Sequence, residues 1–172
     1  MRSLNVYAAS IEMLPNTSLE LTQGQYMDLA FEEEAEVSIE DYWRMAGGKT
    51  AVLLSTCAAL GAISAEVKSE RIAAYAEFGR KLGLAFQAHD DILGIWGSES
   101  ETGKSNHSDL LAGKKSLPVL IGLELKGQFA ELWHQWNFAA ETVSQLAAAL
   151  ESDGAQAKSI ELVNQLTQEA MS

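Results

Sequence analysis

The sequence has little cysteine, proline, histidine or basic charge, and each shortage narrows the class of protein. Cys57 is the one cysteine among 172 residues, so an internal disulfide is excluded and the usage fits a reducing cytoplasm. Twelve Lys and Arg face 24 Asp and Glu, which leaves a net charge of −12. That charge argues against nucleic acid or an anionic membrane as partner. The histidines at 89, 107 and 134 lack metal-ligand spacing.

The sequence also lacks long apolar runs and strand-like alternation. We find no run of membrane-span length and no signal-peptide core after Met1, so we expect no membrane span. With two prolines and few alternating segments, the sequence predicts an all-α fold. The length suits one helical domain over residues 1–172.

Apolar spacing, caps and breakers place the expected helices. We expect a stop at Pro15, a Thr17–Glu20 capping box and a break at Gly47-Gly48. The predicted helices cover residues 3–13, 18–35, 39–46, 49–64, 66–95, 116–125, 129–150 and 155–170. The helix 49–64 is apolar on nearly every side, so it should be central, with Cys57 as a small core residue.

A pair of acids near the end of helix 66–95 is the first candidate site. Gln87, Asp90, Asp91 and Gly94 continue a helical face that is apolar one turn earlier. Adjacent carboxylates suit Mg²⁺, which takes one or two carboxylates together with substrate phosphates. Lysines follow at 104, 114 and 115, in a polar segment. This pattern predicts a metal-bridged diphosphate site, and the alternative is a solvated helix end with a charged loop.

Two upstream motifs are the other candidates. Gln25 and Asp28 share one helical face, as a polar patch or as part of a site. Lys49 and Thr50 follow the predicted Gly-Gly break, where a helix N-terminus would present N–H groups to an oxyanion. The alternative for Lys49 is a surface lysine at a frayed helix end.

The ordered motifs resemble those of trans-prenyl diphosphate synthases, the family of geranyl-, farnesyl- and geranylgeranyl-diphosphate synthases. The match comprises GQxxDL at 24–29, Lys49-Thr50, FQxxDDxL at 86–93, Gly103-Lys104, Asp109 and KKSLP at 114–118. The resemblance implies an isoprenoid-synthase helical bundle, of which this chain is similar to the C-terminal half. It also implies Mg²⁺-dependent condensation of isopentenyl diphosphate with an allylic diphosphate, in the cytoplasm.

The resemblance also implies residue roles. Lys49, Thr50, Gln87, Lys104 and Lys114 would bind the diphosphate, and Lys49, Gln87, Asp90 and Asp91 would be catalytic. Asp90 would be the metal ligand, with Asp91 and Asp109 supporting the metal and its waters, and Gln25 and Asp28 would line the cavity.

Two departures from the family pattern open alternatives. Gly94 stands at the usual third aspartate of DDxLD, and residues 1–24 contain no DDxxD motif. We therefore expect weak or absent turnover by the isolated chain, and a homodimer or a partner that supplies the missing half. The alternatives are a non-catalytic subunit that modulates a full-length synthase, and a terpene cyclase, which would also need the first metal motif. A bare side on helix 51–64 should mark the interface.

Overall fold

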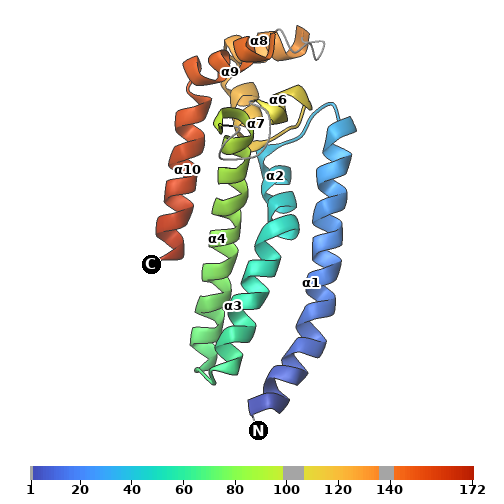
Figure 1. The fold of residues 1–172 in the computed structure, drawn as a ribbon, viewed down its shortest axis with the longest axis vertical. Coiled ribbons are helices and arrows are strands. Elements are labelled where there is room, and N and C mark those ends of the chain that lie inside the picture. The colour runs from blue at the N-terminus through green and yellow to red at the C-terminus, as the bar shows by residue number, and fades with distance from the viewer. Residues whose placement is uncertain (1, 99–106, 136–141) are drawn as a thin grey trace. The chain divides into compact units, whose positions relative to one another are not determined.

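A computed structural model describes residues 2–98, 107–135 and 142–172, with side chains from residue 6 onward. Every regular element of this part of the chain is helical, which confirms the all-α prediction (Figure 1). The elements are α1 (Arg2–Glu33), α2 (Ile39–Ala46), η1 (Gly47–Ala51), α3 (Val52–Ser64), α4 (Ser69–Trp96), α6 (Ser108–Leu111), α7 (Leu117–Leu125), α8 (Gln128–Gln135), α9 (Val143–Ser152) and α10 (Ala155–Ala170).

The chain forms two compact units from interleaved segments. Unit 1 comprises Met1–Leu29, Trp43–Gln87 and Gln165–Ser172, and unit 2 comprises Ala30–Tyr42 and Ala88–Asn164. The expected single domain over residues 1–172 stays a prediction.

The predicted stop at Pro15 is wrong, because α1 passes through this residue. Pro15 and Ile11, whose carbonyl loses its usual N–H partner, are both exposed, so water can replace the missing bond. The predicted capping box is also wrong. The Thr17 hydroxyl donates instead to Met13 O at 2.9 Å within the helix.

The predicted break at Gly47-Gly48 is wrong as well. α2 begins as expected after Ser38, whose hydroxyl accepts the Asp41 N–H at 3.0 Å. The chain then continues through the π-helical turn η1 into α3, with helical torsions at Ala46 and Val52. A Cβ at Gly48 would lie 3.0 Å from Glu20 O and 3.1 Å from Gly24 Cα. This glycine therefore permits close packing of α1 and does not end a helix.

In unit 1, α1, α3 and α4 run side by side (Figure 1). Gly79 lets α4 approach α3, since a Cβ there would lie 2.5 Å from Leu54 O, and Gly83 lets α4 approach Ala51 of η1. Only one side of α3 is covered, by burial of Thr56, Ala59 and Ala62. The prediction of a bare side on this helix is confirmed, whereas the prediction of a buried Cys57 is wrong because this residue is exposed.

The continuous helix Ile39–Ser64 bears on the expectation that no segment spans a membrane, which stays a prediction. Among the described residues it is the one helix that is long and apolar enough to cross a membrane by length and composition, with mean hydropathy 1.4. Sequence reasoning missed it because it treated Gly47-Gly48 as a break. A helix that packs against other protein passes the same test.

In unit 2, α7, α8 and α9 pack around Leu117, Ile121, Phe129, Leu146 and Leu150, all essentially buried. Pro118 lies in the first turn of α7, as predicted. The predicted helix 129–150 is wrong, because α8 ends at Gln135 and α9 begins at Val143. Trp136 and Lys104 lie outside the described residues.

Candidate functional site

The first polar group of unit 1 is the ion pair between Lys49 of η1 and Asp28 of α1. Lys49 Nζ donates to Asp28 Oδ2 at 2.5 Å, and the two side chains are 25% and 16% exposed. Close contact of the helices at Gly24 makes this possible, because a Cβ there would overlap the Lys49 backbone nitrogen. Partial burial strengthens the pair relative to a fully exposed one.

The second polar group of unit 1 joins Thr50 of η1 to Gln87 of α4. The Thr50 hydroxyl donates to Gln87 Oε1 at 2.6 Å, and Gln87 is buried. This bond fixes the orientation of the Gln87 amide beside Thr50. Lys49 and Thr50 lie within a continuous helix, so the predicted helix N-terminus with free N–H groups is wrong. Their own side chains remain as the candidate anion ligands.

Asp91 of α4 is the buried centre of the polar group in unit 2. It is 0% exposed, and Oδ1 accepts from Lys114 Nζ at 3.1 Å. Oδ2 accepts the Leu117 N–H at 3.0 Å, at the start of α7. A buried carboxylate with a cation and a backbone donor is compensated inside the protein, so Asp91 holds Lys114 and α7 in place.

Asp109 of α6 is the second carboxylate on Lys114. Lys114 Nζ donates to Asp109 Oδ2 at 3.3 Å, and the Lys114 side chain is 27% exposed. The ammonium therefore lies between Asp91 and Asp109, on a side chain that is partly exposed.

Asp90, the neighbour of Asp91 on α4, is exposed. Within the described residues, the structure gives its carboxylate no hydrogen bond or ion pair. Gln25 is exposed on α1. The structure therefore brings Asp28 to Lys49, Thr50 to Gln87, and Asp91 to Lys114 and Asp109, and places Gln25 in none of these groups.

Of the three aspartates predicted to hold a metal, Asp90 alone is exposed, because Asp91 and Asp109 are buried. Across the described residues, no group of three or more His, Cys, Asp and Glu side chains is placed to hold a metal ion. Asp91 and Asp109 already share a cation, the Lys114 ammonium. This donor set fits Mg²⁺ held by one carboxylate, because Mg²⁺ takes its other ligands from water and phosphates.

Tyr42 of α2 is a member of the unit 2 group that sequence reasoning did not assign. Burial raises the pKa of the Tyr42 phenol well above 10, and the adjacent Asp91 carboxylate raises it further by charge and hydrogen bonding. The sequence carries no signal for this contact, since Tyr42 and Asp91 are distant along the chain. We take Tyr42 as a third group that stabilises the buried carboxylate.

Tyr42 should lower the unfolding free energy of the protein at alkaline pH. A phenol whose folded-state pKa is raised contributes stability below its unfolded pKa of about 10 and loses it as pH rises further. We expect Tyr42→Phe to flatten the fall in unfolding free energy above pH 10. Denaturant unfolding of both proteins between pH 8 and 11 measures this. Parallel curves for the two proteins would contradict the assignment.

Lys115, one of the three lysines that follow the aspartate pair in the sequence, has a structural role in unit 2. Its Nζ donates to Phe31 O at 2.7 Å and to Glu32 O at 3.4 Å, at the C-terminal end of α1. Burial lowers the Lys115 pKa, and Glu34 and Glu32 oppose that shift. A cation at a helix C-terminus satisfies its last carbonyls, so this lysine caps α1.

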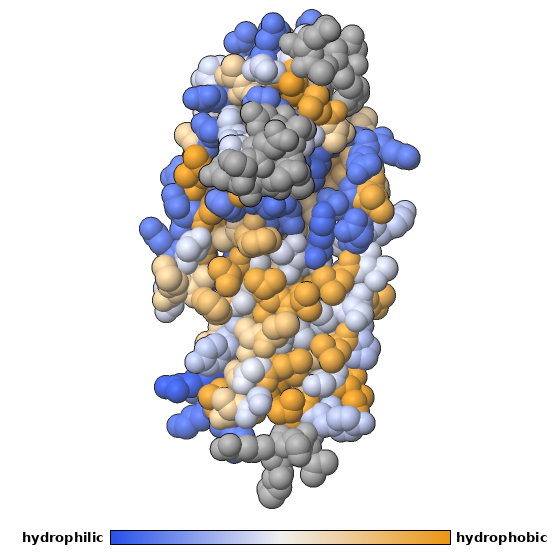
Figure 2. Space-filling view, viewed as in Figure 1, coloured by the Kyte–Doolittle hydropathy of each residue, from blue (hydrophilic) through white to orange (hydrophobic). Residues whose placement is uncertain are grey.

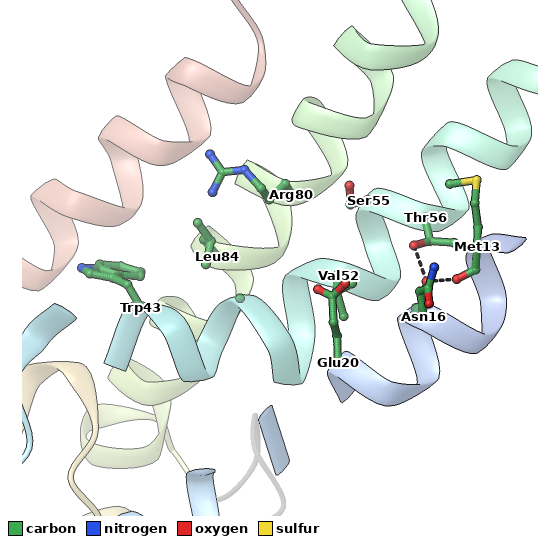
Figure 3. Close-up of a pocket in the computed structure, with 11 residues that line it drawn as sticks. Met13, Asn16, Glu20, Trp43, Val52, Ser55, Thr56, Arg80 and Leu84 are labelled. Carbon is green, nitrogen blue, oxygen red and sulfur yellow. Dashed lines mark hydrogen bonds between the residues drawn. The ribbon is translucent and has the colours of Figure 1, made fainter. Parts of the chain in front are cut away.

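A cavity of about 470 Å³ lies in unit 1, between α1, α3 and α4 (Figure 3). Met13, Val52 and Leu84, labelled in Figure 3, give it apolar walls. The hydroxyl oxygens of Thr17 and Thr56, which also line it, lie 2.7 Å apart. None of the predicted site residues lines it. The cavity is therefore separate from the polar groups described above.

Comparisons with known proteins agree on one family. The family model for polyprenyl synthetase matches residues 1–152. A geranylgeranyl diphosphate synthase of Mycobacterium tuberculosis is 44% identical over 125 residues, covering 73% of this chain and 36% of that protein.

Solved structures show the same fold. A polyprenyl synthetase of Streptomyces coelicolor A3(2) superimposes with a TM-score of 0.85 at 30% identity, over 96% of this chain and 52% of that one. A polyprenyl synthase of Caulobacter crescentus CB15, complexed with calcium and isoprenyl diphosphate, gives 0.85 at 26% identity, over 94% of this chain and 51% of that one. This chain thus spans about half the length of these solved structures.

Proposed function

We propose, from the premise that this chain belongs to the polyprenyl synthetase family, that it takes part in condensing isopentenyl diphosphate with an allylic diphosphate. The observation that supports this most strongly is the pairing of its motif residues. Lys49 and Thr50 are held by Asp28 and Gln87, and Lys114 is held by Asp91 and Asp109. A relative with calcium and isoprenyl diphosphate supports the same ligand chemistry.

In this proposal, unit 1 supplies anion ligands for the allylic diphosphate. Lys49 would contribute a charge that Asp28 orients, and Thr50 and Gln87, bonded to each other, would line the same diphosphate. Positive charge aimed at the diphosphate stabilises it as it leaves and the allylic carbon becomes cationic. Lys104 would add a further cation.

Unit 2 would supply the metal ligand and a positioned cation. Asp90 would hold Mg²⁺, which when bound neutralises charge on the leaving diphosphate. Lys114, held between Asp91 and Asp109, would contact the diphosphate. Asp91 would act on the metal and its waters only indirectly, because its oxygens are already used by protein donors.

The exposed apolar surface of unit 1 supports the proposal of a partner. Figure 2 shows apolar side chains gathered on the face over the unit 1 helices. The exposed large apolar side chains of the unit 1 helices are Tyr7, Ile11, Leu14, Leu19, Tyr26 and Leu29 of α1, Leu53 of α3, and Tyr75, Phe78, Leu82 and Phe86 of α4. An apolar surface of this extent marks an interface. We propose that a second copy, or a chain with the remaining helices of a synthase, covers it in the cytoplasm.

The second candidate is a non-catalytic subunit that binds a full-length synthase and alters its product. The same exposed surface favours it. This subunit would not need Asp90, whereas the prenyltransferase would.

Incorporation of labelled isopentenyl diphosphate into prenyl products distinguishes the two. The assay uses Mg²⁺ and each allylic diphosphate, with the chain alone and mixed with the N-terminal half of a relative. We expect little product from the chain alone, product from the mixture, and loss of at least about a hundredfold with Asp90→Ala. Glu70→Ala, an exposed acid on the same helix, is the control. Product unaffected by Asp90→Ala, or none in any mixture, would contradict the catalytic proposal.

A further inference from the structure

The segment before and within α6 is fastened to the last turn of α4. His107 Nδ1 lies 2.7 Å from Ile95 O, and the Ser108 hydroxyl donates to Gly94 O at 3.3 Å. α4 ends at Trp96, so these carbonyls lack partners within the helix. Their bonds to His107 and Ser108 fix the position of the next residue, Asp109, beside the last turn of α4.

The Asp109 carboxylate lies directly over the backbone of Gly94. A Cβ at residue 94 would lie 2.5 Å from Asp109 Cγ and Oδ2 and 2.6 Å from Oδ1. Real Cβ contacts are essentially never that short, so residue 94 cannot carry a side chain while Asp109 keeps this position. Asp109 is itself buried, with its side chain 11% exposed.

Residue 94 follows Asp90 by four positions and Asp91 by three on α4, so a side chain there would neighbour both acids. The Asp109 carboxylate occupies that place. Asp109 also lies close to Asp91, because Lys114 Nζ contacts Asp91 at 3.1 Å and Asp109 at 3.3 Å.

We propose that Gly94 and Asp109 are a matched pair: Asp109 supplies from α6 the third carboxylate on this face of α4, and a carboxylate from residue 94 can replace it. This carboxylate is a positioning group that, with Asp91, holds Lys114 toward a metal-bound diphosphate. That role of Lys114 rests on the proposed function. The replacement of the Asp109 carboxylate by one at residue 94 is independent of the proposed function.

Exchanging the two residues tests the pairing through stability. Gly94→Asp should lower the urea midpoint through the clash, and Asp109→Gly should lower it through loss of the carboxylate. The double variant should recover at least half of the larger loss, as coupled neighbours do. Gly94→Ala with Asp109→Gly is the matched control, since it fills the same space without a charge. Additive losses in the exchanged protein would overturn the proposal.

Binding of inorganic pyrophosphate with Mg²⁺, measured by calorimetry, tests the positioning of Lys114. Asp109→Gly and the alanine control should bind about tenfold more weakly than wild type, and the exchanged protein within about threefold of it. Exchanged protein that binds no better than the alanine control would overturn the positioning role. Wild type that does not bind pyrophosphate would count against the proposed function, while the urea midpoints still decide the pairing.

Discussion

Gly24→Ala is expected to destabilise the protein by about 3 kcal/mol and to separate Lys49 from Asp28. The new Cβ would overlap the Lys49 backbone nitrogen and lie 2.5 Å from the Gly48 carbonyl carbon and 2.8 Å from Lys49 Cα. These are backbone atoms of a helix, so no side chain can rotate away to relieve the contact. α1 must therefore move from η1, and Asp28, one turn after Gly24, moves with it. Urea unfolding of the two proteins measures the loss.

Gly61→Ala is the matched control for this substitution. A Cβ at Gly61 would have nothing within 4 Å, and the residue is exposed inside α3. Alanine should therefore stabilise the protein by about 0.5–1 kcal/mol, because it restricts the unfolded chain. Equal changes in unfolding free energy for the two variants would contradict close packing of α1 on η1.

Asp91→Ala is expected to destabilise the protein by about 3–5 kcal/mol, because it removes one partner of a buried ion pair. Lys114 would lose its 3.1 Å contact, the Leu117 N–H its 3.0 Å acceptor, and Tyr42 its neighbouring carboxylate. The start of α7 should loosen at the same time. Urea unfolding gives the free energy, and hydrogen exchange of the Leu117 amide reports on the helix start.

Asp90→Ala tests whether Asp90 and Asp91 have different roles. Asp90 is exposed, so its removal should change the unfolding free energy by no more than about 0.5 kcal/mol. It should nevertheless abolish Mg²⁺-dependent activity if it is the metal ligand. Similar destabilisation by both substitutions would show that the two carboxylates do not divide their roles as proposed.

The sequence predicted helices where a local signal has one physical meaning. Ser38 before α2 and Pro118 in the first turn of α7 are such signals, and the helices begin there. Pro15 and Gly47-Gly48 have two possible meanings. A proline on an exposed helix face is tolerated, and glycine serves either a break or a close approach. Only the packing of α1 on η1 decides between them.

The sequence motifs named candidate residues, but they did not predict which residues contact one another. The motif order identified Lys49, Gln87, Asp91 and Lys114, which the structure places in polar contacts. Adjacent residues on a helix point about 100° apart, and the sequence does not tell which of two aspartates faces inward. The contact of Tyr42 with Asp91 and that of Asp109 with Gly94 join residues from different elements, so no local pattern encodes them.

The most direct test of a metal–diphosphate site is a crystal structure of the chain with Mn²⁺ and an allylic thiolodiphosphate. The account predicts anomalous density for Mn²⁺ at the Asp90 carboxylate, with diphosphate oxygens within hydrogen-bond distance of Lys114. Diphosphate bound away from Lys114, or Mn²⁺ bound without Asp90, would contradict it.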